Sequence, residues 1–200
     1  MSQVEVSPIE QSGAVGTIGK LLLDSGRLTA EQAEKVAKRQ QEKRIRFGEA
    51  AVELGFIKPE DIQYALSRQF SYAYLQPGDG LVSDEIVAAY HPFSAYVEKL
   101  RTLRSELNQR WFKQGHKSLL LACDKEGSGC TELAANLAVV FAQLGEKTLL
   151  IDGDLRESSQ HLLFKVANKQ GLADLLADRA DLGCIHKVHR LPGLSVLTAG

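Results

Sequence analysis

Two short apolar runs, separated by a glycine-rich loop and a helix, constrain the fold of this chain more than any other feature. The runs cover residues 118–123 and 147–152, the loop covers 124–129, and the pattern predicts a helix over 130–144. Strands that alternate with helices indicate a parallel sheet with right-handed crossovers. A third strand is predicted over 194–198. We therefore expect an α/β fold built on a parallel sheet, of which this chain holds only a part.

The first part of the chain contains an internal repeat. A shift of 29 residues places Gly19 on Gly48 and Gly26 on Gly55, and the apolar positions follow the same shift. Each copy has the pattern of a short helix, a glycine turn and a longer helix. The repeat therefore predicts a small all-α domain with helices over 17–24, 30–43, 47–53 and 59–69.

Local signals define where these helices begin and end. Thr29 and Gln32 have the spacing of a capping box, and Pro59 suits the first position of a helix. Gly26 and Gly55 stand where the preceding helix should end in a left-handed residue.

The repeat is followed by a turn-rich break, Gln-Pro-Gly-Asp-Gly at 76–80, which is typical of a linker. A second amphipathic helix is predicted over 94–112. We expect a flexible tail at 1–16, a helical tandem-repeat domain at 17–75, a linker at 76–93 and a partial α/β domain at 94–200.

Composition excludes several classes of function. The 24 basic and 25 acidic side chains nearly balance, so no global field favours nucleic acid. The apolar runs are too short to cross a bilayer, and residues 1–16 lack the pattern of a secretion signal. Three cysteines, Cys123, Cys130 and Cys184, are too few and too irregular for a disulfide framework or a zinc site. We expect a cytoplasmic protein whose link to a membrane, if it has one, comes through a partner.

The loop between the first two apolar runs has the setting of a phosphate-binding loop. Gly127 and Gly129 allow consecutive backbone N–H groups to turn towards an anion at a helix N-terminus, and Thr131 is placed to give its hydroxyl to Mg²⁺. Against the pattern G-x-x-x-x-G-K-[ST], Asp124 replaces the first glycine and Cys130 replaces the lysine. The predicted nucleotide-binding residues are Lys125, Glu126, Gly127, Ser128, Gly129, Cys130, Thr131 and Glu132.

Two carboxylates follow the second apolar run, in Leu-Ile-Asp-Gly-Asp-Leu-Arg at 150–156. They lie at the carboxyl end of a predicted strand, where ligands of open α/β sheets collect. With the loop and the Ala-Ala-Asn-Leu-Ala run at 134–138, this part of the chain resembles the bacterial tyrosine kinases that regulate exopolysaccharide chain length. The resemblance implies a P-loop fold, Mg·ATP or Mg·ADP as cofactor, and a membrane chain-length determinant protein as partner.

The resemblance also implies roles for individual residues. Asp152 corresponds to the base that accepts a tyrosine proton, while Asp154 and Thr131 correspond to the ligands of Mg²⁺. Cys130 cannot supply the charge of the missing lysine. Lys125 occupies the place of an extra lysine in related deviant loops, and we hypothesise that it compensates. Cys130 itself has two interpretations: a reactive thiol with a depressed pKa at a helix N-terminus, or simply a lost lysine.

The predicted helix over 94–112 contains Glu98, Arg101 and Arg104, which match the E-x-x-R-x-x-R motif of the same kinases. In those relatives the motif lines subunit contacts, which implies self-association here. A solvated helix face with one ion pair is the simpler interpretation.

The tandem repeat resembles the N-terminal module of type II secretion and type IV pilus assembly ATPases, some of which bind cyclic di-GMP. The resemblance implies a cyclic di-GMP site at Gly19, Leu22, Gly26, Gln40, Arg46, Gly48, Gly55 and Gln69. Alternatively, the glycines end helices, the aliphatic side chains pack the module, and the module docks another protein. Two hypotheses remain for the whole chain: a tyrosine-kinase-like protein with reduced or absent catalysis, or a non-catalytic sensor that regulates polysaccharide assembly.

Overall fold

The computed structural model describes residues 17–70, 73–76, 78–125 and 127–200. The chain divides between residues 71 and 72 into two compact units, which are described separately. The predicted tail at 1–16 lies outside the described residues. No helix in the described part has the length and apolar character needed to cross a membrane.

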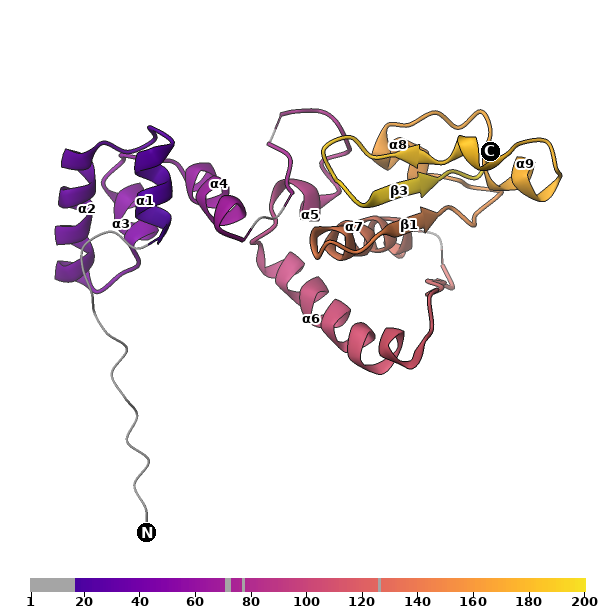
Figure 1. Cartoon of the computed structure of the whole chain (residues 1–200), viewed down its shortest axis with the longest axis horizontal. Helices are drawn as coiled ribbons and strands as arrows, with labels where there is room; N and C mark the ends of the chain where they lie inside the picture. Colours follow the sequence, from indigo (N-terminus) through magenta and orange to yellow (C-terminus); the bar gives the residue numbers. More distant parts are fainter. Residues whose placement is uncertain (1–16, 71–72, 77, 126) are drawn as a thin grey trace, which may run out of the picture. The chain divides into compact units, whose positions relative to one another are not determined.

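The first unit consists of helices, which lie at the positions expected from sequence (Figure 1). They are α1 (Thr17–Asp24), α2 (Ala30–Lys43), α3 (Phe47–Glu53) and α4 (Pro59–Phe70). Helix α1 packs on α4, and α2 packs on α3. Their shared core contains Leu22, Leu28, Ala33, Val36, Phe47, Ala50, Ala51, Ile57 and Ala65.

The ends of these helices follow the local signals. The backbone N–H of Gln32 donates to the Thr29 hydroxyl at 3.2 Å, and the Thr29 N–H donates to the Gln32 side chain at 2.9 Å, which confirms the capping box. Gly26 and Gly55 have φ of 69° and 70°, the left-handed conformation predicted for both turns. Only glycine adopts this conformation without a steric penalty.

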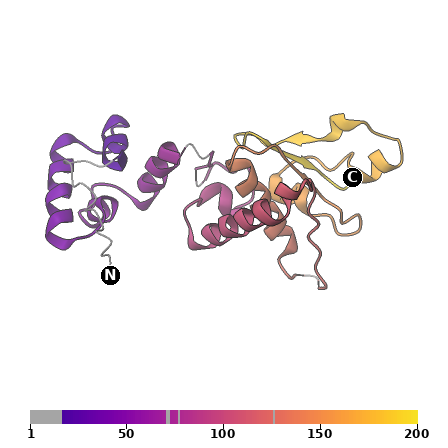
Figure 2. The ribbon, with the colours of Figure 1, turned by 60° about the horizontal axis from the view of Figure 1, so that its bottom comes forward.

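The second unit combines helices with a small sheet (Figures 1 and 2). Its longer helices are α6 (Ala95–Arg110) and α7 (Cys130–Gln143). Its shorter helices are α5 (Val87–Tyr90), η1 (Phe112–Gln114), α8 (Gln160–Phe164), α9 (Leu172–Leu176) and η2 (Leu182–Cys184). Its strands are β1 (Thr148–Ile151), β2 (His186–Lys187) and β3 (Leu194–Leu197).

Helix α7 is central to this unit, because it packs against α5, α6, α8, β1 and β3. Its apolar side chains lie in the main core with residues of all these neighbours. The position of α7 therefore fixes where its N-terminus, and the loop before it, stand relative to the end of β1.

The sheet has the strand order β1-β3-β2. Strands β1 and β3 pair in parallel, with Thr148 opposite Leu194 and Ile151 opposite Leu197, as expected for two strands joined by a crossover. Strand β2 pairs with β3 in the antiparallel sense, so the sheet is mixed rather than wholly parallel.

The strand predicted over 118–123 does not form. These residues have no strand conformation, and 87% of the Leu120 surface is exposed. The Trp111 indole N–H donates to the Ser118 carbonyl at 2.8 Å, which ties the start of the segment to the end of α6. A strand needs a neighbour for its backbone groups, and the described strands do not supply one to this segment. Apolar character alone therefore misled the prediction.

The segment 76–93 also differs from the linker that its turn residues indicated. Val82, Ile86 and Tyr90 are fully buried in the core of the second unit. The Tyr90 hydroxyl donates to the Val82 carbonyl at 2.9 Å and accepts from the Val82 N–H at 3.2 Å. Proline and glycine mark turns, but they do not reveal whether the neighbouring apolar residues find a core.

Candidate nucleotide site

The loop that precedes α7 has the backbone conformation of an anion-binding turn at two positions. Gly127 has φ of 71°, and Gly129, the N-cap of α7, has φ of 81°. A Cβ placed on Gly127 would meet no atom within 4 Å, so the space beside the loop is open. Because α7 has 14 residues, its first turn presents unpaired N–H groups and a positive dipole end. These features suit a phosphate group.

The remaining loop residues differ in their surroundings. Lys125 and Ser128 are exposed, while Cys130, Thr131 and Glu132 are half-buried. The predicted ligand Glu126 lies outside the described residues. Burial, and secondly the Glu132 carboxylate, raises the pKa of the Tyr96 phenol on α6. The side chain of Glu132 therefore lies near Tyr96, and a negative charge already stands beside the start of α7.

Cys130 does not have a free thiol. Its sulfur is bonded to that of Cys123, seven residues earlier, with a Cα–Cα distance of 6.1 Å. Three cysteines are too few for a disulfide framework, but two of them form this single bridge, which the sequence interpretation did not include. The two cysteines bracket the six residues 124–129, but whether they pair depends on how tightly this loop turns, which the sequence does not specify.

Ser159, to which no sequence pattern pointed, makes hydrogen bonds to both Thr131 and Asp152. The Ser159 hydroxyl donates to the Thr131 hydroxyl at 3.3 Å, and the Ser159 backbone N–H donates to Asp152 Oδ2 at 3.1 Å. Gln160 adds a bond from its side-chain amide to the Thr131 carbonyl, at 3.0 Å. The start of α7, the end of β1 and the start of α8 therefore form one hydrogen-bonded cluster.

Asp152 is buried, with 6% of its surface exposed, and its carboxylate is fully engaged. Oδ1 accepts from the Asp154 N–H at 3.2 Å, and Oδ2 accepts from the N–H groups of Ser159 and Gln160 at 3.1 and 3.0 Å. Backbone N–H groups compensate a buried carboxylate for the loss of water. In this arrangement Asp152 holds the turn that leads from β1 into α8.

Asp154 lies in the same turn but bonds locally. Its Oδ1 accepts from the backbone N–H groups of Glu157 at 2.9 Å and Arg156 at 3.0 Å. These two bonds, first that of Glu157 and then that of Arg156, hold the pKa of the Asp154 carboxyl below its usual 3.8. The side chain is therefore a carboxylate at neutral pH, as a ligand for Mg²⁺ must be.

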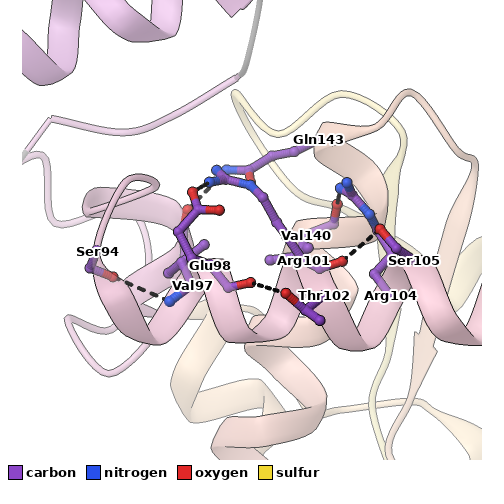
Figure 3. Close-up of polar contacts among 10 residues, drawn as sticks. Ser94, Val97, Glu98, Arg101, Thr102, Arg104, Ser105, Val140 and Gln143 are labelled. Carbon is purple, nitrogen blue, oxygen red and sulfur yellow. Dashed lines mark hydrogen bonds and ion pairs between the residues drawn. The ribbon is translucent and has the colours of Figure 1, made fainter. Parts of the chain in front are cut away.

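The two arginines of the α6 motif lie against their own unit, whereas Glu98 is exposed to solvent (Figure 3). Arg101 and Arg104 are 8% and 7% exposed. The Arg104 guanidinium donates to the Val140 carbonyl of α7 at 2.8 Å, and Arg101 pairs with Glu98 on its own helix. The motif thus joins α6 to α7, which neither sequence interpretation anticipated; a role in self-association stays a prediction.

Two further polar residues of α7 make hydrogen bonds to the backbone of the segment before α6. The Asn136 side chain accepts from the Ala88 N–H at 2.8 Å and donates to the Glu85 carbonyl at 2.9 Å. The Gln143 amide donates to the carbonyls of Ala73 and Ala88 at 3.0 and 2.9 Å. The asparagine of the Ala-Ala-Asn-Leu-Ala run therefore makes a tertiary contact with the segment before α6.

The residues proposed for cyclic di-GMP have identifiable packing roles in the first unit. Leu22 is fully buried, Gly26 and Gly55 end helices, and a Cβ on Gly48 would lie 2.9 Å from Ile62 Cδ1. Gly19 is buried, Gln40 is half-buried, Arg46 is exposed, and the side chain of Gln69 lies outside the description. Helix packing accounts for Leu22 and Gly48, and the left-handed turns at the helix ends account for Gly26 and Gly55.

Comparison with known proteins finds homologues among bacterial tyrosine-protein kinases. The chain is 41% identical over 109 residues to CapB of Staphylococcus aureus, a candidate tyrosine-protein kinase, covering 54% of this chain and 48% of that protein. It is 36% identical over 115 residues to the tyrosine-protein kinase YwqD of Bacillus subtilis, covering 58% and 48%. Among solved structures, it resembles the kinase domain of the Escherichia coli tyrosine kinase ETK, with 34% identity, a TM-score of 0.55, and coverage of 57% and 45%.

The chain thus spans about half the length of these two curated relatives. No model of a protein family matches the sequence.

Proposed function

We propose that the second unit binds Mg·ATP or Mg·ADP through residues 125–132, and that the chain is a tyrosine-kinase-like regulator of exopolysaccharide chain length with little or no phosphotransfer. The observation that carries this proposal is the hydrogen-bonded cluster of Thr131, Ser159 and Asp152. It joins the phosphate loop to the acidic end of β1, which is where a P-loop protein holds a nucleotide and its metal.

The described residues suit the phosphate end of a nucleotide. The open space beside Gly127, the left-handed Gly129 and the N-terminus of α7 provide backbone donors without any positive side chain. The Thr131 hydroxyl and the ionised Asp154 are oxygen ligands of the kind that Mg²⁺ prefers. Bound Mg²⁺ neutralises phosphate charge and orients the phosphates.

Catalysis is expected to be weak for two reasons. First, the lysine of the loop is replaced by Cys130, whose sulfur is held by Cys123 and carries no positive charge. A charged hydrogen bond of this kind is worth about 1.5–3 kcal/mol. Lys125, which is exposed, is the basic residue within the loop that can replace part of this lost interaction.

Second, Asp152 is poorly placed to act as a base. Both of its carboxylate oxygens already accept hydrogen bonds from the backbone of the turn after β1. A carboxylate that is 6% exposed and bonded to three backbone N–H groups is held away from an incoming tyrosine hydroxyl. This supports a regulatory relative over an efficient kinase.

Regulation through contacts requires partners, and we propose the membrane chain-length determinant that the resemblance implies. The chain would act in the cytoplasm and reach the membrane surface through that partner. Self-association would use the exposed side of α6, where Glu98 lies, because Arg101 and Arg104 already pack against the unit. The packing roles of the repeat residues give no observation that favours cyclic di-GMP as a second function.

Calorimetric titration of the full chain with Mg·ADP, in the presence of a reductant, tests the proposal. We expect weak binding by the unchanged chain and tighter binding by Cys130→Lys, by roughly ten- to a hundredfold, because the new ammonium group restores a charged hydrogen bond. Cys130→Ser is the matched control, since it removes the sulfur without adding charge.

Two further measurements separate the contributions. Thr131→Ala should lower affinity for Mg·ADP but leave affinity for ADP in EDTA unchanged, because the hydroxyl acts through the metal. Lys125→Ala should weaken binding by the unchanged chain more than binding by Cys130→Lys, if Lys125 compensates. Absence of binding by both the unchanged chain and Cys130→Lys, with both folded, would refute the proposed site.

A further inference from the structure

The bond between Cys123 and Cys130 encloses the phosphate loop at both ends. Cys123 is the last residue before the loop, and Cys130 is the first residue of α7. The intervening residues 124–129 include both left-handed glycines. A Cα–Cα distance of 6.1 Å lies within the range of native disulfides, so the bridge and the loop are geometrically compatible.

The bridge is accessible to reagents. Cys123 is an exposed residue and Cys130 is half-buried, so Cys123 is the more accessible of the two cysteines to an incoming thiolate. The third cysteine, Cys184, is a free thiol in η2, outside the loop. Disulfides in reducing compartments are usually transient and regulatory rather than structural. An exposed bridge over a functional loop has the properties of that class.

We propose that Cys123 and Cys130 form a reversible dithiol–disulfide couple that closes and opens the phosphate loop. A dithiol reductant attacks the Cys123 sulfur, the bond between the two cysteines breaks, and the Cys130 sulfur leaves and takes up a proton. The second thiol of the reductant then displaces Cys123, which leaves two protein thiols and one oxidised reductant. Disulfides such as oxidised glutathione drive the reverse reaction, in which the protein thiols lose two electrons and two protons.

Closure of the ring restricts the loop. In the bonded form Cys123 and Cys130 are joined covalently, which limits the conformations open to the chain between them, including Gly127 and Gly129. In the reduced form the same residues gain conformational freedom, which an anion would have to remove on binding. The loop to which we assign phosphate binding is therefore under redox control. The couple itself does not depend on that assignment.

The test uses the full chain without nucleotide. The protein is equilibrated in glutathione buffers from reducing to oxidising, quenched with acid, alkylated and analysed by peptide mass. As the buffer becomes more oxidising, we expect the alkylated fractions of Cys123 and Cys130 to fall together, while Cys184 is alkylated at every buffer composition. Hydrogen exchange at residues 127–131 should be slower in the oxidised protein than in the reduced one.

Variants assign the effect to this pair. Cys184→Ser should leave the transition unchanged, whereas Cys123→Ser should abolish it and give Cys130 at most a mixed disulfide with glutathione. Alkylation of both Cys123 and Cys130 at every buffer composition, pairing of either one with Cys184, or equal hydrogen exchange in both forms would overturn the proposal. Since no measurement includes ADP, failure of nucleotide binding cannot be mistaken for failure of the couple.

Discussion

Asn136 provides the sharpest test of how α7 organises the second unit. Its side chain is 1% exposed and makes two bonds to the segment before α6: it accepts from the Ala88 N–H at 2.8 Å and donates to the Glu85 carbonyl at 2.9 Å. A third bond, to the Glu132 carbonyl at 2.8 Å, stays within α7. Asn136→Ala removes all three and leaves the N–H of fully buried Ala88 without its acceptor.

The expected loss of stability follows from these contacts. Two tertiary hydrogen bonds contribute about 1 kcal/mol each, and a buried donor left unsatisfied costs a further 1–3 kcal/mol or so. Alanine is the better helix former, which returns roughly 0.5 kcal/mol. We therefore expect Asn136→Ala to lower the free energy of unfolding of the second unit by about 2.5–4.5 kcal/mol.

Urea unfolding followed by fluorescence measures this change, because Trp111 is the single tryptophan and lies in the second unit. Asn108→Ala on α6 is the matched control, since Asn108 is only half-buried and the substitution is chemically identical. It should change stability by about 0.5 kcal/mol or less. A loss below about 1 kcal/mol for Asn136→Ala, similar to that of the control, would refute the role given to these bonds.

Two further predictions concern single positions. Gly48→Ala should destabilise the first unit by about 0–2 kcal/mol, because overpacking against Ile62 Cδ1, 2.9 Å from the new Cβ, is partly offset by the higher helix propensity of alanine in α3; thermal unfolding followed by circular dichroism measures this, and Ile62→Val should restore part of any loss if the clash is the cause. Because the pKa of Asp154 in the folded chain is below its usual 3.8, the ionised side chain stabilises the folded chain at pH values above 3.8. This contribution is lost as the pH falls through the lower pKa of the folded chain. Asp154→Asn should therefore reduce the dependence of stability on pH below about pH 4, and an NMR titration of Asp154 with a pKa at or above 3.8 would contradict the bonds from Arg156 and Glu157.

The helix boundaries of the first unit could be predicted because their signals are local. The Thr29 capping box and the left-handed glycines Gly26 and Gly55 act within one turn of the chain. Strands β1 and β3 were also predictable, since each is a short apolar run that a crossover brings into a parallel pair. In these cases the residues that cause the structure are neighbours in sequence.

The candidate site was predictable in part. The loop, Thr131 and the two aspartates were singled out from their spacing together with the resemblance to the kinases, and their roles stay predictions. Ser159, which joins Thr131 to Asp152, could not be found, because it carries no motif and acts through a contact between segments 28 residues apart. The same limit applies to the Cys123–Cys130 bridge, whose formation depends on how tightly the loop turns.

The sequence by itself determined the helices of the first unit, helices α6 and α7, strands β1 and β3, and the chemistry available at the end of β1. Only the tertiary structure decided which of those elements found partners. Residues 118–123 are apolar but lack a neighbouring strand among those described, whereas 76–93 contain turn residues and still bury Val82, Ile86 and Tyr90. Arg104 likewise reaches the carbonyl of Val140, although charge alone favoured solvent. The physical reason is that hydrogen bonding and burial depend on distant segments, which local pattern does not specify.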